Sequence, residues 1–406
     1  MTDSPPHIAI LGAGPIGLEA GLAAAERGLP FTIFDAAPSV AGHVRSWGHV
    51  RMFTPWAMNV SARMGGALAG HGVAVPDGDD LPTGDDLVDR LYAPVAALPQ
   101  MHGRLRLDTR VDAVGRDGLL KHEEIGTAAR SRHRFRLLVR AADGAETVEH
   151  ADVVIDATGT YGNPNTLGDG GIPAPGERAL ADRIEQRLPD FAADPQAWAG
   201  RTILLTGSGH SAQTAAHQLA TFARDAPGTK VVWAVRRAEP TFGAVAGDPL
   251  PERAALNAGA AELAAGACDA IELRPGRVIE AVAQRDSRLV VTLRNGGAEE
   301  VVVDRILSLN GGVGDFTIYR QLQVHECYAT TGPMRLAATL LGAAGGDCLA
   351  QTGHGPDTLV NPEPGFFIVG AKSYGRNSQF LLRIGWRQID DVFGLLDGDA
   401  SGVETA

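Results

Sequence analysis

Two glycine-rich turns are the segments of this 406-residue chain whose residue types and spacing point most directly to chemistry. The first is Gly12-Ala-Gly14-Pro15-Ile16-Gly17, in which the first glycine allows a tight turn, the second lets the backbone approach a pyrophosphate and the third allows close helix packing. A helix N-terminus behind the turn offers N–H groups to phosphates. Asp35 follows after roughly 20 residues, the spacing at which an acid accepts hydrogen bonds from a ribose. These residues predict a dinucleotide site, with a plain turn as the alternative.

A second turn of the same kind begins near the middle of the chain, as Gly207-Ser-Gly209-His210-Ser211-Ala212. Alanine at the third position still allows the helix to pack closely. After the next strand the acid is replaced by Arg236-Arg237. Arginine can pair with a ribose 2′-phosphate, so this site favours NADPH over NADH, although the two arginines could also be ordinary surface charges. His210 either touches the nicotinamide nucleotide or is an exposed neighbour of the turn.

Alternating apolar and helical patterns surround both turns and predict the elements that position them. Residues 151–156 form a further apolar strand that runs into Ala157-Thr158-Gly159, and residues 365–370 form a strand ending on Gly370. The expected strands are 7–11, 31–34, 104–111, 151–156, 202–206, 230–235 and 365–370, and the expected helices are 18–27, 212–224 and 378–396. This order predicts an α/β fold with two Rossmann-like dinucleotide-binding domains.

The chain resembles the two-dinucleotide-binding flavoproteins, a superfamily that includes thioredoxin reductases and flavin-containing monooxygenases. The matching stretches are GAGPIG with Asp35, LPTGDDLVDRLYAPVA with strand 104–111, VVIDATGTYGNP, GSGHSA with Arg236-Arg237, and FFIVGAKSYGR. The resemblance implies FAD on the first turn and NADPH on the second, with the NADPH domain (171–305) inserted into an FAD domain (1–170 and 306–406). It also implies a homodimer as one assembly state. Hinges for a rotation of the NADPH domain are expected near 165–200 and 300–312, where Gly311-Gly312 could absorb the change.

Two segments are candidates for the flavin pocket. In similar flavoproteins the loop that corresponds to residues 45–56 runs beside the flavin ring, which suggests Trp47 as cover and His49 and Arg51 as polar groups; an aromatic cluster that packs the domain interface is the alternative. The second segment lies between strand 365–370 and the last helix. There Lys372 is expected to offset charge on reduced flavin or bind an acidic substrate, or else to be exposed. The expected cofactor contacts in and near these segments are Trp47, Thr158, Gly159, Gly370, Gln379 and Phe380.

Several departures from the family patterns keep the reaction open. The expected NADPH domain holds only Cys268 where reductases carry a dithiol pair, and the FxGxxxH linker of monooxygenases is replaced by residues 171–177. The acid that follows glycine near the C-terminus of many relatives is replaced by Ala371-Lys372. The favoured hypothesis is a monooxygenase that uses NADPH, FAD and O2 on a small molecule. The alternative is a reductase that passes electrons to a quinone, metal species, thiol compound or protein carrier. A non-catalytic flavin-binding regulator is a third, less favoured class.

No metal site is predicted, although Cys327 and Cys348 could form a redox pair or bind a soft metal with His325 or His354. The formal net charge of −12 predicts a surface that repels nucleic acid and anionic membranes. The first residues lack a signal-peptide pattern, so the expected location is the cytoplasm. The run Arg130, Arg132, Arg134 and Arg136 precedes an apolar stretch and is expected to be a solvated strand face.

Overall fold

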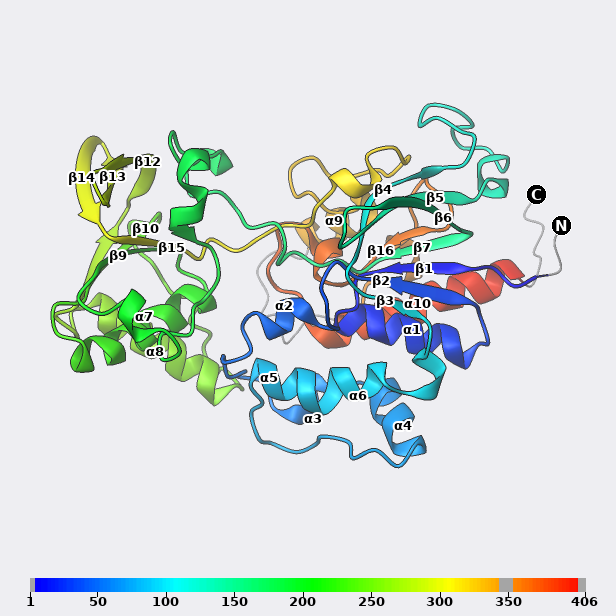
Figure 1. Cartoon of the computed structure of the whole chain (residues 1–406), viewed down its shortest axis with the longest axis horizontal. Coiled ribbons are helices and arrows are strands. Elements are labelled where there is room, and N and C mark those ends of the chain that lie inside the picture. Colours follow the sequence, from blue (N-terminus) through cyan, green and yellow to red (C-terminus); the bar gives the residue numbers. More distant parts are fainter. Residues whose placement is uncertain (1–3, 343–352, 401–406) are drawn as a thin grey trace. The chain divides into compact units, whose positions relative to one another are not determined.

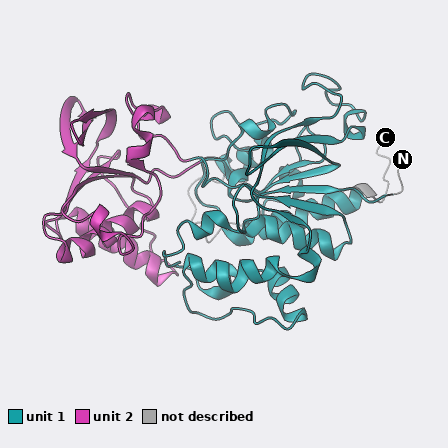
Figure 2. Ribbon diagram, viewed as in Figure 1, with its two compact units in different colours: residues 1–163, 313–406 teal, residues 164–312 magenta. Residues whose placement is uncertain are grey.

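The computed structural model describes residues 4–342 and 353–400, and the chain divides into two compact units. Unit 1 comprises residues 1–163 and 313–406, and unit 2 comprises residues 164–312 (Figure 2). The middle of the chain is therefore inserted into a unit built from both ends. The units divide at 163/164 and 312/313, whereas the expected domains divide at 170/171 and 305/306.

The two crossings between the units are hydrogen-bonded to one another. Asn165 donates its backbone N–H to the carbonyl of Gly311 over 2.9 Å, and Val313 donates to the carbonyl of Asn163 over 3.1 Å. Pro164 and Gly312 form an antiparallel bridge between these bonds. Gly311 has a φ of +74°, a conformation that glycine adopts without the steric cost of a side chain. The entry into unit 2 and the exit from it thus form one two-stranded connection.

A five-stranded parallel sheet forms the centre of unit 1, in the order β16-β7-β1-β2-β3. Its strands are β1 (Ile8–Leu11), β2 (Phe31–Phe34), β3 (Leu105–Arg106), β7 (Val153–Asp156) and β16 (Phe366–Ile368). All four residues of β1 are buried, with Ile8 and Ile10 on one face and Ala9 and Leu11 on the other. Both faces are covered, which explains why the parallel strands are apolar throughout rather than alternating.

Helices cover one face of this sheet and a small antiparallel sheet covers the other (Figure 1). The antiparallel sheet has the order β4-β5-β6, with β4 (Thr109–Arg116), β5 (Phe135–Ala141) and β6 (Glu146–Ala151). The helices of unit 1 are α1 (Pro15–Glu26), α2 (Gly42–Arg45), α3 (Trp56–Asn59), α4 (Ala62–Gly70), α5 (Gly84–Leu87), α6 (Ala93–Ala96), α9 (Met334–Gly342) and α10 (Leu382–Ala400). The two long helices, α1 and α10, place their apolar sides in the same core.

Several expected elements of unit 1 have other bounds in the structure: α1 begins before the expected residue 18, Ala151 of the expected strand 151–156 ends β6, and the expected strand 365–370 is a strand only over Phe366–Ile368. Two further elements differ for a clear local reason. The single strand expected at 104–111 is two strands in different sheets, because Asp108 adopts a φ of +48° between β3 and β4 and turns the chain. The expected helix 378–396 begins only at Leu382, since residues 378–381 form a loop in which Gln379 donates its backbone N–H to the side chain of Asn377. By contrast, β2 has the expected bounds.

Unit 2 repeats the plan of unit 1 on a smaller scale. Its parallel sheet has the order β11-β10-β9-β15-β8, and its antiparallel sheet has the order β12-β13-β14. The strands are β8 (Ile184–Glu185), β9 (Thr202–Thr206), β10 (Lys230–Val235), β11 (Ile271–Pro275), β12 (Val278–Arg285), β13 (Arg288–Asn295), β14 (Gly297–Val303) and β15 (Arg305–Ser308), and the helices are α7 (His210–Asp225) and α8 (Pro251–Ala264). The expected strands 202–206 and 230–235 are confirmed. The two sheets share one apolar core.

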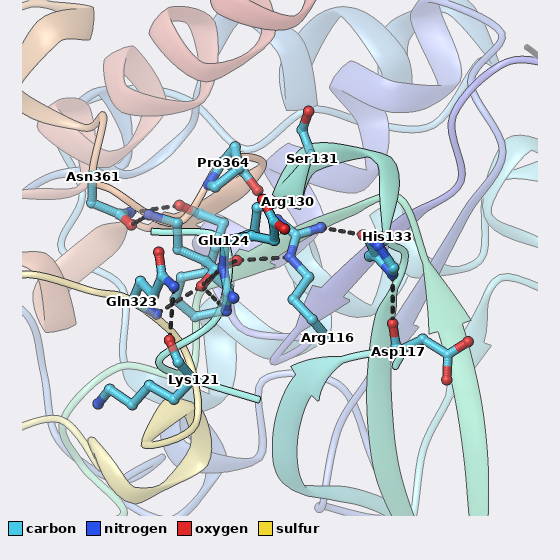
Figure 3. A network of polar contacts seen from close by, with 12 residues as sticks. Arg116, Asp117, Lys121, Glu124, Arg130, Ser131, His133, Gln323, Asn361 and Pro364 are labelled. Atoms are coloured by element: carbon cyan, nitrogen blue, oxygen red, sulfur yellow. Dashed lines mark hydrogen bonds and ion pairs between the residues drawn. The ribbon is translucent and has the colours of Figure 1, made fainter. Parts of the chain in front are cut away.

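The arginine run before β5 is not a solvated strand face throughout. Arg130 lies in a single helical turn before β5, is only 1% exposed, and pairs with the buried Glu363 over 2.8 Å. Arg116, at the end of β4, pairs with the same carboxylate over 2.7 Å, and Gln323 donates its backbone N–H to it (Figure 3). A buried carboxylate needs such partners to offset its loss of hydration. Because the partners come from distant parts of the chain, charge patterning along the sequence could not predict this cluster. Arg132, Arg134 and Arg136 are exposed as expected.

No helix among residues 4–342 and 353–400 combines the length and apolar character needed to cross a membrane.

Candidate functional site

The first glycine turn lies at the carboxyl end of β1, where ligands bind in open parallel sheets. Gly12 has a φ of +98°, and a Cβ atom there would lie 2.8 Å from the carbonyl oxygen of Ala157. A Cβ at Gly17 would lie 1.8 Å from the carbonyl oxygen of Gly12, so neither position accepts a side chain. Gly14 has nothing within 4 Å of where a Cβ would stand. The turn thus has no room for a side chain at its first and third glycines, whereas its second glycine faces open space, as approach by a pyrophosphate requires.

Asp35 lies beside this turn and also holds it in place through hydrogen bonds from the backbone. Its carboxylate accepts the backbone N–H of Ala13 over 2.6 Å and that of Ala37 over 2.8 Å, one on each oxygen. A carboxylate oxygen has capacity for a second hydrogen bond, so a ribose hydroxyl can still be accepted. Sequence reasoning assigned the ribose contact alone and missed the role in holding the turn.

The second glycine turn has the same shape in unit 2. Gly207 has a φ of +105°, and a Cβ there would lie 2.3 Å from the carbonyl oxygen of Leu309. Gly209 has nothing within 4 Å of its Cβ position, like Gly14 in the first turn. The indole of Trp233 donates to the carbonyl of Gly207 over 2.8 Å and fixes the turn on β10.

The polar residues predicted around the second turn are exposed. His210 and Ser211 are the first two residues of α7, and Arg236 and Arg237 follow directly after β10. The guanidinium groups therefore stand at the carboxyl end of β10, the position that Asp35 holds after β2 in unit 1. Their contact with a 2′-phosphate remains a prediction.

The loop that carries Trp47, His49 and Arg51 is held against the segment leading into α5. Met52 donates its backbone N–H to the carbonyl of Pro82 over 2.8 Å, and Gly84 donates to Val50 over 3.0 Å. A Cβ at Gly84 would lie 2.8 Å from the ring of Trp47, so glycine is needed to seat the indole. Trp47 packs beside the core of unit 1.

His49 and Arg51 differ in their surroundings. The Nε2 atom of His49 is buried and has no hydrogen-bond partner among the described residues. A buried polar atom without a partner costs free energy, so this atom is suited to bind a group that the polypeptide does not supply. Arg51 is exposed. Of the two polar candidates in this loop, His49 therefore has the stronger structural support.

Lys372 is completely buried, so the alternative that it is exposed is wrong. Its ammonium donates to Asp156 over 2.6 Å, to the hydroxyl of Thr158 over 3.1 Å and to the carbonyl of Asp315 over 2.7 Å. The ring of Tyr319 lies 5.1 Å from the ammonium, and burial raises the pKa of that phenol, which keeps it neutral. Sequence reasoning missed Asp156, although an acid at the end of the apolar run Val153–Asp156 was a visible signal.

The remaining predicted contacts lie around Lys372 and the start of α10. Gly159 has a φ of +71° and open space at its Cβ position. Gly370, by contrast, is buried and donates its backbone N–H to the side chain of Gln388 over 2.8 Å. Phe380 packs its ring edge-on against Tyr374, with ring centroids 5.5 Å apart. Gly159 thus offers free space to a ligand, whereas Gly370 and Phe380 make internal contacts; Gln379 is half-buried in the loop before α10.

Residues 4–342 and 353–400 include only part of the cysteine pair considered from the sequence. Cys268 and Cys327 are free thiols there, whereas Cys348, the expected partner of Cys327, lies outside the described residues. That part of the chain contains no group of three or more histidine, cysteine or acidic side chains placed to hold a metal ion.

Comparison with solved structures gives matches over nearly the whole chain. Bacillithiol disulfide reductase from Bacillus cereus matches with a TM-score of 0.71 at 17% sequence identity, covering 98% of this chain and 100% of that one. The desferrioxamine-pathway cadaverine monooxygenase from Erwinia amylovora, bound to FAD, matches with 0.67 at 12%, covering 98% and 95%. Ornithine N-hydroxylase from Kutzneria sp. 744, with reduced FAD, NADP+ and L-ornithine, matches with 0.64 at 15%, covering 98% and 100%.

The chain has the two-dinucleotide-binding flavoprotein fold. No protein-family model and no curated protein sequence matches it. The solved flavoproteins of this fold include both disulfide reductases and monooxygenases, so the fold is common to the two reactions considered from the sequence. At 12–17% identity the likeness is one of fold.

Proposed function

We propose that unit 1 binds FAD, that unit 2 binds NADPH, and that the protein is an FAD-dependent NADPH oxidoreductase. One observation carries the proposal: each unit has a glycine turn at the carboxyl end of a parallel strand, closed behind its first glycine and open at its second. Two dinucleotides on one chain suit hydride transfer between them. Solved proteins of the same fold carry FAD, and one carries reduced FAD together with NADP+.

The residues of the first turn fit an FAD molecule. The backbone of Gly14 and the N-terminus of α1 would receive the pyrophosphate, and Asp35 would accept the ribose hydroxyls. Gly159 leaves space beside the turn, and the unpaired Nε2 of His49 offers a hydrogen bond for the flavin side. Bound FAD supplies the capacity to take up a hydride and pass on electrons.

The residues of the second turn fit NADPH. Gly209 and the first residues of α7 would receive its pyrophosphate, and Arg236 and Arg237 would pair with its 2′-phosphate. Both guanidinium groups are exposed and positively charged where unit 1 carries Asp35, so their charge favours a phosphate at that strand end. The preference for NADPH over NADH is part of the proposal.

For the reaction itself we favour a monooxygenase that uses O2 and a small-molecule substrate. The compared flavoproteins include a monooxygenase and an N-hydroxylase, and the NADPH unit holds Cys268 as its single cysteine. The second candidate is a reductase that delivers electrons to a quinone, metal species, thiol compound or protein carrier. It is favoured by the whole-chain likeness to a disulfide reductase, with a TM-score of 0.71.

Reoxidation kinetics separate the candidates. The purified protein is reconstituted with FAD, reduced by NADPH without oxygen and mixed rapidly with O2 while flavin absorbance is recorded. A transient spectrum distinct from those of oxidised and reduced flavin supports the monooxygenase. Direct reoxidation by O2, together with faster reoxidation by a quinone, ferric chelate or disulfide, supports the reductase. Bound FAD without any NADPH oxidation would instead indicate a flavin-binding regulator.

A further inference from the structure

Two buried ion clusters lie at opposite ends of strand β16 in unit 1. Glu363, before the strand, pairs with Arg116 and Arg130 (Figure 3). Lys372, after the strand, pairs with Asp156, and both of these side chains have no exposed surface. In a parallel sheet only the carboxyl ends of the strands face a bound dinucleotide. The two clusters are therefore alike in burial and differ in whether they stand at the ligand-binding edge.

The Lys372 cluster joins three segments of chain that are far apart in sequence. An ammonium has three N–H donors, and each is used by a different acceptor: Asp156 at the end of β7, Thr158 just after it, and the carbonyl of Asp315 where the chain re-enters unit 1. Lys372 itself belongs to the turn that follows β16. A Cβ at Gly314 would lie 2.4 Å from Cγ of Lys372, so the re-entering chain passes as close as a glycine allows.

The same cluster reaches the first glycine turn through one further contact. Thr158 donates its hydroxyl to Asp156 over 2.7 Å, which fixes the Ala157-Thr158-Gly159 segment at the end of β7. The carbonyl oxygen of Ala157 is the atom that a Cβ at Gly12 would strike at 2.8 Å. A shift of the segment that Lys372 holds would therefore move the wall against which the glycine turn is built.

We propose that Lys372 and Asp156 are positioning residues of the FAD site: their ion pair sets the turn after β7 against the first glycine turn, and FAD affinity depends on it. This inference rests on the proposed function. It also replaces the expectation that Lys372 offsets charge on the flavin, because all three of its donors are already used inside the protein. Neutralising one partner leaves the other as a buried, unpaired charge, which is more disruptive than neutralising both.

The test compares variants at the two ends of β16. Lys372→Met, Asp156→Asn and the double variant are prepared without FAD, and two quantities are measured: the Kd for FAD by titration and the Tm of the FAD-free protein. Each single variant is expected to raise the Kd by about tenfold or more, and the double variant by less than the product of the two, because the residues act as a pair. The control, Glu363→Gln, is expected to lower the Tm and to leave the Kd within about twofold of the original.

The measured Kd values distinguish failure of the proposed function from failure of the positioning role. If the original protein does not bind FAD, the proposed function fails. If it binds FAD and Lys372→Met or Asp156→Asn leaves the Kd within about twofold, the positioning role is overturned and the pair is structural, like Glu363. An equal rise in Kd for Glu363→Gln also overturns it, because loss of stability alone would then explain the effect.

A milder substitution covers the case in which the ion-pair variants do not fold. Thr158→Val removes the hydroxyl that bonds to both partners, and Thr158→Ser keeps it. The valine variant is expected to raise the Kd for FAD by roughly fivefold, with serine restoring it to within about twofold, since the two hydrogen bonds of the Thr158 hydroxyl are at stake. Equal Kd values for the valine and serine variants contradict the proposal.

Discussion

The two glycine turns have the same backbone shape and opposite charge. Gly12 and Gly207 both have positive φ angles and both press against a neighbouring carbonyl, while Gly14 and Gly209 both face open space. The strand after the first turn leads into Asp35, whose carboxylate holds that turn, whereas the strand after the second leads into two exposed arginines. In the proposed function, backbone shape accounts for what the sites share, a cradle for a pyrophosphate, and charge accounts for the different dinucleotide that each would bind.

Substitution at the third position of the glycine turn is expected to have the largest effect on stability and on FAD retention. A Cβ at Gly17 would lie 1.8 Å from the carbonyl oxygen of Gly12, whereas unit 2 already has the buried Ala212 at the equivalent position. Gly17→Ala should cost roughly 3 kcal/mol or more of unfolding free energy and abolish FAD retention, since the helix must move away from the turn. Denaturant unfolding and the flavin absorbance of the purified protein measure both effects.

The matched change in unit 2 is Ala212→Gly. It removes a methyl group from the first turns of α7 and should cost only about 1 kcal/mol. A Gly17→Ala protein that keeps its FAD and its stability would show that the two turns do not differ at this position.

Substitution of Asp35 is expected to have the next largest effect, because its carboxylate holds the turn and would also bind the ribose of the ligand. In Asp35→Ala the backbone N–H groups of Ala13 and Ala37 lose their acceptor, and unfolding free energy should fall by about 2–4 kcal/mol. Asp35→Asn keeps one acceptor oxygen and should lose less stability. Both should weaken FAD binding, which titration of the FAD-free protein measures. Unchanged FAD affinity in Asp35→Ala would show that Asp35 does not contribute to FAD binding at the first turn.

The arginines of the second turn give the smallest and most selective effect. Arg236→Ala and Arg237→Ala should each raise the KM for NADPH by roughly tenfold, as expected for loss of a charge-assisted hydrogen bond to phosphate, and leave the KM for NADH nearly unchanged. Arg224→Ala, an exposed arginine at the other end of α7, serves as the control. Equal effects on NADPH and NADH would show that the arginines do not read the 2′-phosphate.

The sequence was sufficient for what neighbouring residues decide. Strands Phe31–Phe34, Thr202–Thr206 and Lys230–Val235 are local apolar runs bounded by turn residues, and the structure has them with the expected bounds. The break between β3 and β4 was not predictable, because nothing in the apolar pattern marks the left-handed conformation of Asp108.

Contacts between segments that are far apart in the chain could not be predicted from the sequence either. Lys372 and Asp156 are 216 positions apart, and Arg130 and Glu363 are 233 positions apart. Charged residues next to apolar runs usually lie at the surface, so their burial follows only once the fold has brought the partners together. For this reason Lys372 was expected at the flavin or in solvent, and Arg130 in solvent.

Anaerobic titration of the FAD-loaded protein with NADPH tests the central claim most directly. The account predicts that flavin absorbance bleaches with one NADPH per FAD, and that Arg236→Ala/Arg237→Ala needs a higher NADPH concentration for the same bleaching. A protein that binds no FAD, or that holds FAD and is not reduced by NADPH, would contradict it.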